Sequence, residues 1–282
     1  MKSFFLMVSF FTRLPVPGVE YTEERFGKAM RLLPLVGLLA GVILVLAQVL
    51  LLALHASGLL RGAALVCVYI FLTGGLHFDG LADTCDGVFS GRSREQSLGI
   101  MKDSRIGVFG TLGILMAGLL YFACFIIASA PALLAFPICG RACCLISASL
   151  APYAREEGMG KAVSVGGGPL SVVSAIISLV AGAALSALLE GLIIRLGATF
   201  GALYEISLTS GGFYRIGATA GAFSGICVLI ASVLAVLIAI AMTAHFKKKL
   251  GGVTGDTYGA VIETSSIVFL FACAILPGVL PI

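Results

Sequence analysis

The chain has 282 residues, of which 59% are hydrophobic and 11% are charged, and its mean hydropathy is +1.11. Soluble domains carry about 25% charged residues, so this composition excludes a water-soluble globular protein. The net charge is only +4, and we expect no nucleic-acid partner.

The chain begins with a short apolar segment, Phe4 to Phe11, which lies between Lys2 and the sequence Thr12-Arg13-Leu14-Pro15. This sequence does not contain the small-residue cleavage site of a signal peptide. We therefore predict that residues 1–31 form an interfacial N-terminal segment, with a helix lying on the membrane surface.

Long apolar runs follow, and several reach the roughly 20 residues that a helix needs to cross a hydrocarbon core. Lipid offers the backbone no hydrogen-bonding partner, so unbroken runs of this length indicate helices rather than barrel strands. The sequence predicts an all-α, polytopic integral membrane protein with about seven transmembrane helices, built as one domain over residues 1–282. The predicted spans are 32–54, 59–76, 107–128, 132–153, 169–192, 219–243 and 258–280. Residues 197–218 fit a loop, a re-entrant segment or an interfacial helix.

The basic residues decide the orientation. With a cytoplasmic N-terminus, 14 of the 18 lysines and arginines fall in inside segments and three fall outside. The positive-inside rule therefore predicts this orientation, with segments 77–106, 154–168 and 245–257 in the cytoplasm. Arg92 and Arg94 fit simple positive-inside anchors.

Small residues recur at four-residue spacing in two predicted spans. Gly217, Gly221 and Gly225 enter the sixth span, and Gly37 and Gly41 lie in the first. Such spacing favours close helix packing, within a subunit or between subunits. The spacing does not decide between a monomer and a homo-oligomer.

The five aspartates all fall in two inside segments, 77–107 and 245–257. In a helix, Asp79, Asp83 and Asp86 would share one face. Solvated acids favoured by a helix dipole are the simpler interpretation. Their crowding beside the membrane, with no lysine at helical spacing, instead favours a divalent cation whose shell a substrate phosphate completes.

Further candidates surround these acids. His77 fits a general base, a metal ligand or a hydrogen-bonded structural group. Lys102 and Arg105, with Asp103 between them, are suited to holding phosphate oxygens. These assignments stay alternatives at the level of sequence.

A second inside segment supplies another acid. Gly255 and Asp256 follow a glycine-rich stretch that would let backbone amides approach a phosphate before the next helix. Glu263 and Arg141 lie inside spans, where an ionisable group is functional or paired. A buried arginine must meet an anion, either Glu263 or a substrate phosphate, and Arg155 lies at the inner end of its span.

Together these segments resemble a known family. The run from Gly74 to Asp83, continued through Asp86-Gly87, resembles the signature of the cobalamin synthase family, the adenosylcobinamide-GDP ribazoletransferases. Agreement extends to Ile100–Gly107, Tyr153-Ala154-Arg155, Gly255-Asp256 and the opening Phe10–Pro17. The resemblance covers the whole chain, with several motifs in order.

The resemblance implies a prokaryotic, multi-pass enzyme of the cytoplasmic membrane that uses Mg²⁺. Its substrates would be adenosylcobinamide-GDP and α-ribazole or α-ribazole 5′-phosphate, and GMP would leave. The Mg²⁺ ligands would be Asp79, Asp83, Asp86 and Asp256. Catalytic roles would fall to His77, Asp83, Asp103 and Arg105. Substrate contacts would come from Lys102, Arg141, Arg155, Gly255 and Glu263.

Two other functions remain as alternatives. A CDP-alcohol phosphotransferase also uses spaced aspartates beside a membrane, but the order of its motif is lacking here. An ion-coupled transporter would place acids near the midplane, between broken helices. The sequence leaves open the acceptor, the lower base, the number of metal ions and the identity of the general base.

Overall fold

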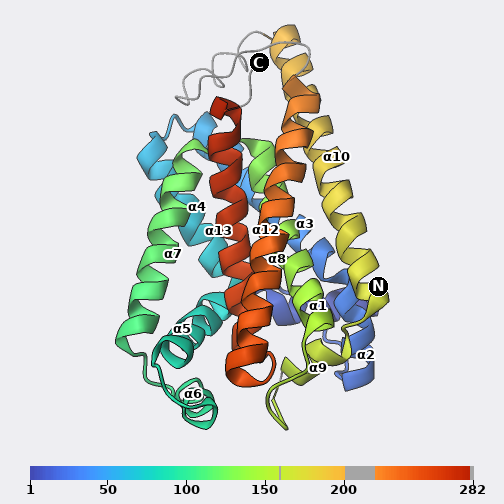
Figure 1. Ribbon diagram of the computed structural model, residues 1–282. Coiled ribbons are helices and arrows are strands. Elements are labelled where there is room, and N and C mark those ends of the chain that lie inside the picture. Colours follow the sequence, from blue (N-terminus) through green and yellow to red (C-terminus); the bar gives the residue numbers. More distant parts are fainter. Residues whose placement is uncertain (159, 201–219, 280–282) are drawn as a thin grey trace.

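The computed structural model describes residues 1–158, 160–200 and 220–279, and Figure 1 shows them as a bundle of helices. The prediction of an all-α, polytopic membrane protein is confirmed. Six described helices are long and apolar enough to cross a membrane. They are α3 (Leu33–Ala53), α7 (Val108–Ile127), α8 (Ala130–Leu150), α10 (Pro169–Phe200), α12 (Ala220–Leu250) and α13 (Gly255–Val279). Most of the predicted segment 197–218 lies outside the described residues.

Helix α8 forms the centre of the bundle, since nearly all of its side chains are buried. The predicted close packing at Gly37 and Gly41 is confirmed. A Cβ at either position of α3 would lie within 2.4 Å of a backbone oxygen of α8. Gly225 packs against Ala187 of α10, so at this position the close packing occurs within the subunit. Gly217 lies outside the described residues. Oligomerisation stays a prediction.

The candidate for the seventh crossing is α4 (Gly58–Thr73), which among the described helices meets the length of a span only together with α5 (Leu76–Phe89), across a bend. Helix α4 ends earlier than the predicted span 59–76, and α5 leaves it at 90°. Gly74 and Gly75 both have left-handed φ angles, +64° and +70°, which other residues adopt only with strain. The glycine pair therefore turns the chain, and we count α5 as outside the membrane-spanning segments.

The N-terminal segment is helical, as predicted. Helix α1 (Lys2–Phe11) is followed by α2 (Glu23–Ala29) and by the 3₁₀ turn η1 (Met30–Leu32). The residues after α1 reach the α4–α5 bend, where Arg13 N–H donates to Leu72 O at 2.8 Å. The ring of Phe11 lies 6.0 Å from that of His77. The opening motif thus supports the bend, and its contact with lipid stays a prediction.

The three segments predicted to be cytoplasmic meet at one end of the bundle. Figure 1 shows α5, α6 (Arg94–Ile100), α9 (Gly160–Val165) and the turn between α12 and α13 at the lower end of the view. These elements come from distant parts of the chain. The end at which they gather contains the candidate site.

Candidate active site

The acid-bearing helix α5 places its three aspartates in different surroundings. The predicted helical spacing is confirmed, because residues 76–89 form one helix. Asp79 is exposed, Asp83 is partly buried, and Asp86 is only 9% exposed. The acids are therefore not equivalent.

Asp86 contacts the start of α7. Its carboxylate oxygens accept hydrogen bonds from Gly107 N–H at 2.7 Å and from Gly110 N–H at 2.8 Å. A carboxylate is well suited to this place, because the first amides of a helix have no internal partner. A Cβ at Gly107 or Gly110 would come within 2.5 Å of the carboxylate. Asp86 thus fixes the loop before α7 onto α5.

Asp256 lies in the first turn of α13, which Thr254 caps. Thr254 Oγ1 accepts from Thr257 N–H at 3.2 Å, and it donates to Asp256 Oδ2 at 3.3 Å. Arg155 Nη2 lies 2.9 Å from the same carboxylate oxygen. The structure therefore brings together Arg155 and Asp256, two residues chosen from the sequence.

The crossing of α5 and α13 brings Asp256 close to the acids of α5. A Cβ on Gly80 would lie 2.7 Å from the backbone oxygen of Asp256, so the two backbones touch there. Burial raises the pKa of Asp83 to about 7, and the charges of Asp256, Asp79 and Asp86 add to this increase. Asp83 thus lies near three other carboxylates, while the nearby Arg155 acts in the opposite direction on its pKa.

Backbone pairing joins two of the loops. Ala154 N–H donates to Val253 O at 2.8 Å, and Val253 N–H donates to Pro152 O at 2.9 Å. This short parallel contact holds the loop after α8 against the loop before α13. Arg155 follows Ala154 directly and Asp256 lies three residues after Val253, which explains why they meet.

Arg94 ties α6 to both of these loops. Its Nε donates to Leu250 O at 2.8 Å and its Nη2 donates to Ala154 O at 2.9 Å. The sequence pattern favoured a simple positive-inside anchor at Arg94 and did not predict these contacts. A single arginine beside a membrane carries no sequence signal for contacts 60 and 156 residues away.

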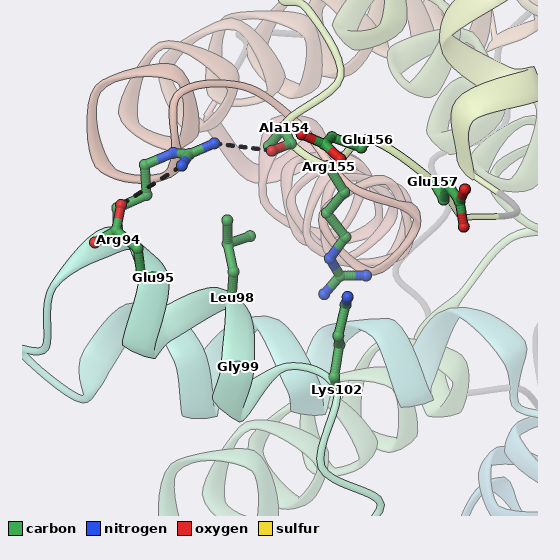
Figure 2. A pocket seen from close by; sticks show the side chains of 9 residues that line it. All are labelled: Arg94, Glu95, Leu98, Gly99, Lys102, Ala154, Arg155, Glu156 and Glu157. Atoms are coloured by element: carbon green, nitrogen blue, oxygen red, sulfur yellow. Dashed lines mark hydrogen bonds and ion pairs between the residues drawn. The ribbon is translucent and has the colours of Figure 1, made fainter.

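The 102–105 segment divides into two parts. Arg105 donates to both carboxylate oxygens of Asp103, at 3.0 and 2.7 Å, and these hydrogen bonds lower the pKa of Asp103 to about 2. Both side chains are exposed and satisfy each other. Lys102 instead points toward Arg155 across a pocket, as Figure 2 shows.

His77, Arg141 and Glu263 lie in the interior, at 2%, 0% and 0% exposure. Glu263 accepts hydrogen bonds from Tyr69 at 3.1 Å and from Tyr121 at 2.6 Å, and His77 Nδ1 lies 3.5 Å from it. In this structure neither Arg141 nor Glu263 reaches the surface of the site. The two tyrosines supply partners that sequence reasoning did not find.

The donor set can be tested against Mg²⁺. Over the ranges that the structure describes, no group of three or more His, Cys, Asp or Glu side chains is close enough to form a metal cage. Mg²⁺ rarely needs such a cage, because it is usually held by one or two carboxylates plus substrate phosphates. Asp83 and Asp256, with Asp79 nearby, fit that mode. The four-aspartate ligand set stays a prediction.

The fold and the site define a class: a polytopic α-helical membrane protein whose carboxylates and cations meet at one end of the bundle. A family model described as cobalamin-5-phosphate synthase matches residues 3–274, and the chain belongs to this family. The resemblance noted in the sequence is thereby confirmed.

Curated relatives cover almost the whole chain. A protein of Alkaliphilus oremlandii is 37% identical, over 99% of this chain and 100% of its own length. Proteins of Fusobacterium nucleatum (34% identical) and Escherichia coli O157:H7 (35% identical) cover 98% and 96% of this chain, and each aligns over 98% of its own length. All three are named adenosylcobinamide-GDP ribazoletransferase. No solved structure matches.

Proposed function

We propose that this chain joins adenosylcobinamide-GDP to α-ribazole, or to α-ribazole 5′-phosphate, and releases GMP. The observation that carries the proposal is the meeting of Asp83, Asp256, Arg155 and Lys102 at one end of the bundle. These residues come from the segments that resemble the family signature. Relatives that carry the ribazoletransferase name match over nearly the full length.

The reaction is a phosphoryl transfer. A ribose hydroxyl of the acceptor attacks the phosphorus bonded to the cobinamide side, and the diphosphate P–O bond to GMP breaks. The hydroxyl proton goes to a base, and GMP leaves with the bridging oxygen. Catalysis of this kind depends mainly on positioning and charge neutralisation.

The described side chains suggest a division of roles. Asp83 and Asp256, assisted by Asp79, would hold Mg²⁺, which supplies positive charge to the diphosphate oxygens. Arg155 and Lys102 would hold phosphate oxygens directly. His77 is buried, so we assign the hydroxyl proton to a carboxylate of α5 rather than to the imidazole.

The same proposal covers the location of the protein. Its relatives are bacterial, and 14 of the 18 basic residues fall in segments that a cytoplasmic N-terminus places inside. We therefore place the site at the cytoplasmic face of the inner membrane.

The direct test uses the purified full chain in detergent with adenosylcobinamide-GDP, α-ribazole and Mg²⁺. Mass spectrometry should show cobalamin and GMP, and EDTA should prevent both. Asp83→Asn should lower turnover at least about 100-fold with the protein still folded, because it removes a charge that positions the cation. Glu24→Gln, at a distant surface ion pair, is the control.

Other outcomes would assign the chain elsewhere. Near-normal turnover in Asp83→Asn would refute the metal role. Release of CMP from a CDP-alcohol would indicate the phosphotransferase alternative. Gradient-driven uptake by vesicles, with no product in detergent, would indicate a transporter.

A further inference from the structure

A pocket of about 510 Å³ lies between α6 and the segment that follows Tyr153 (Figure 2). Its lining includes Arg94 and Lys102 on one side and Arg155, Glu156 and Glu157 on the other. Pockets of about 300–1,000 Å³ are typical of small-molecule sites. The volume is therefore large enough for more than a phosphate group.

Two cations face this pocket. Figure 2 shows the side chains of Lys102 and Arg155 pointing toward each other. Arg94, by contrast, already bonds Ala154 and Leu250 and lies 3.6 Å from Glu95. Lys102 and Arg155 are therefore the cations placed to receive an anion from the pocket.

Arg155 also links the pocket to the acids. Its Nη2 lies 2.9 Å from Asp256, and neither its buried Nε nor its buried Nη2 makes a hydrogen bond among the described residues. A buried N–H donor is costly without an acceptor, and a ligand oxygen would supply one. An anion between Lys102 and Arg155 would lie beside the carboxylates of the site.

The acidic side of the pocket selects among anions. Glu156 and Glu157 line it, so an inorganic phosphate alone would meet charges of both signs. A ligand with a phosphate at one end and N–H donors at the other would suit both sides. Guanine has such donors in N1–H and its 2-amino group. The substituted benzimidazole of α-ribazole carries no N–H.

We propose that this pocket binds a guanosine 5′-monophosphate unit, with the phosphate at Lys102 and Arg155 and the base at Glu156 and Glu157. The inference deepens the proposed function and rests on it, because it assigns the GMP half of adenosylcobinamide-GDP to the pocket. The scissile diphosphate then lies where Arg155 meets Asp256. The acceptor must approach from another side.

The test measures binding of GMP, guanosine and AMP to the full chain in detergent by equilibrium dialysis, without turnover. The wild-type protein should bind GMP more tightly than AMP or guanosine. Lys102→Gln should weaken GMP binding about 10- to 100-fold, since it removes a charge-assisted hydrogen bond, and Lys102→Arg should restore most of it. Lys248→Gln removes a similar charge from the end of α12 and should have no effect.

A second variant tests the base. Glu156→Gln/Glu157→Gln should reduce the preference for GMP over AMP and leave the phosphate-dependent part of binding unchanged. Wild-type GMP affinity in Lys102→Gln would overturn the assignment. So would a Lys102→Gln defect confined to the KM for α-ribazole 5′-phosphate, because the phosphate would then belong to the acceptor.

Failure of the two proposals can be told apart. GMP binding that depends on Lys102, in a protein that forms no cobalamin, would refute the proposed reaction and leave the nucleotide pocket standing. Cobalamin formation with GMP binding that is indifferent to Lys102 would refute the pocket and leave the reaction standing.

Discussion

Replacing Gly80 with alanine should impair catalysis while leaving the protein folded. Gly80 lies on α5 between Asp79 and Asp83, where α5 crosses the start of α13. An added Cβ would lie 2.7 Å from the backbone oxygen of Asp256 and 3.0 Å from its Cα. The obstructing atoms are backbone, so no rotamer change relieves the contact.

The size of the effect follows from this geometry. Ordinary contacts begin at 3.4 Å, so the two helices must separate locally by roughly 0.7 Å. Overpacking of this kind costs about 1–3 kcal/mol. A displacement near 1 Å at a catalytic site costs about 100-fold in rate, so we expect kcat/KM to fall about 10- to 100-fold. Asp83 and Asp256 would still be present, but too far apart to act on one diphosphate.

The assay compares cobalamin formation by Gly80→Ala and Gly118→Ala, each checked for folding by its thermal transition in detergent. Gly118 lies within α7, and a Cβ there would meet no atom within 4 Å, so this control should retain wild-type rates. Wild-type kinetics in a folded Gly80→Ala protein would refute the view that this crossing sets the geometry of the acids.

The other predictions concern neighbouring residues. Between pH ~4 and about 7, Asp83 is protonated in the folded protein and ionised in the unfolded chain. Without Mg²⁺, the stability of the folded protein should therefore fall as the pH rises through this window. Thermal midpoints in EDTA test this, added Mg²⁺ should reverse the loss, and an increase with pH would contradict it. Asp86→Ala should destabilise the start of α7 by about 1–3 kcal/mol, and unchanged hydrogen exchange at the Gly107 and Gly110 amides would refute the cap. Arg94→Ala should lower kcat/KM about 10-fold, because α6 is then no longer held to the two loops. A lysine cannot donate to Leu250 O and Ala154 O at once in the geometry of a guanidinium, so full activity in Arg94→Lys would contradict this role.

The helices were predictable because lipid imposes their composition. Most of the predicted spans lie within a few residues of the observed helices. The largest misses are at the ends of α10 and α12, which run on to Phe200 and Leu250. The end of α12 becomes polar at Lys247, Lys248 and Lys249 without becoming unsuited to helix, since lysine is a good helix former. The end of α10 stays mostly apolar and carries a single charged residue, Arg195. Hydropathy marks where the apolar run stops, which need not be where the helix stops.

The site was predictable in its members but not in their roles. Helical spacing placed Asp79, Asp83 and Asp86 on α5, yet the direction of Asp86 depends on amides more than 20 residues away. The same holds for Arg94, whose partners lie on two other loops. Sequence spacing reports neighbours within one helix, whereas these contacts exist only after the helices pack.

Some ionisable groups of this protein lie at the candidate site and others lie deep in the bundle, and the buried groups help to position those of the site. Helix α13 carries Asp256 in its first turn and Glu263 two turns further in. Glu263 binds tyrosines of α4 and α7 and lies beside His77 of α5, so it fixes α13 against three helices at once. A buried carboxylate with two hydroxyl donors resists sliding, because any shift leaves it without partners. The buried Glu263 therefore holds Asp256 at the height where Arg155 and Asp83 meet it, and no transport role is needed to explain it.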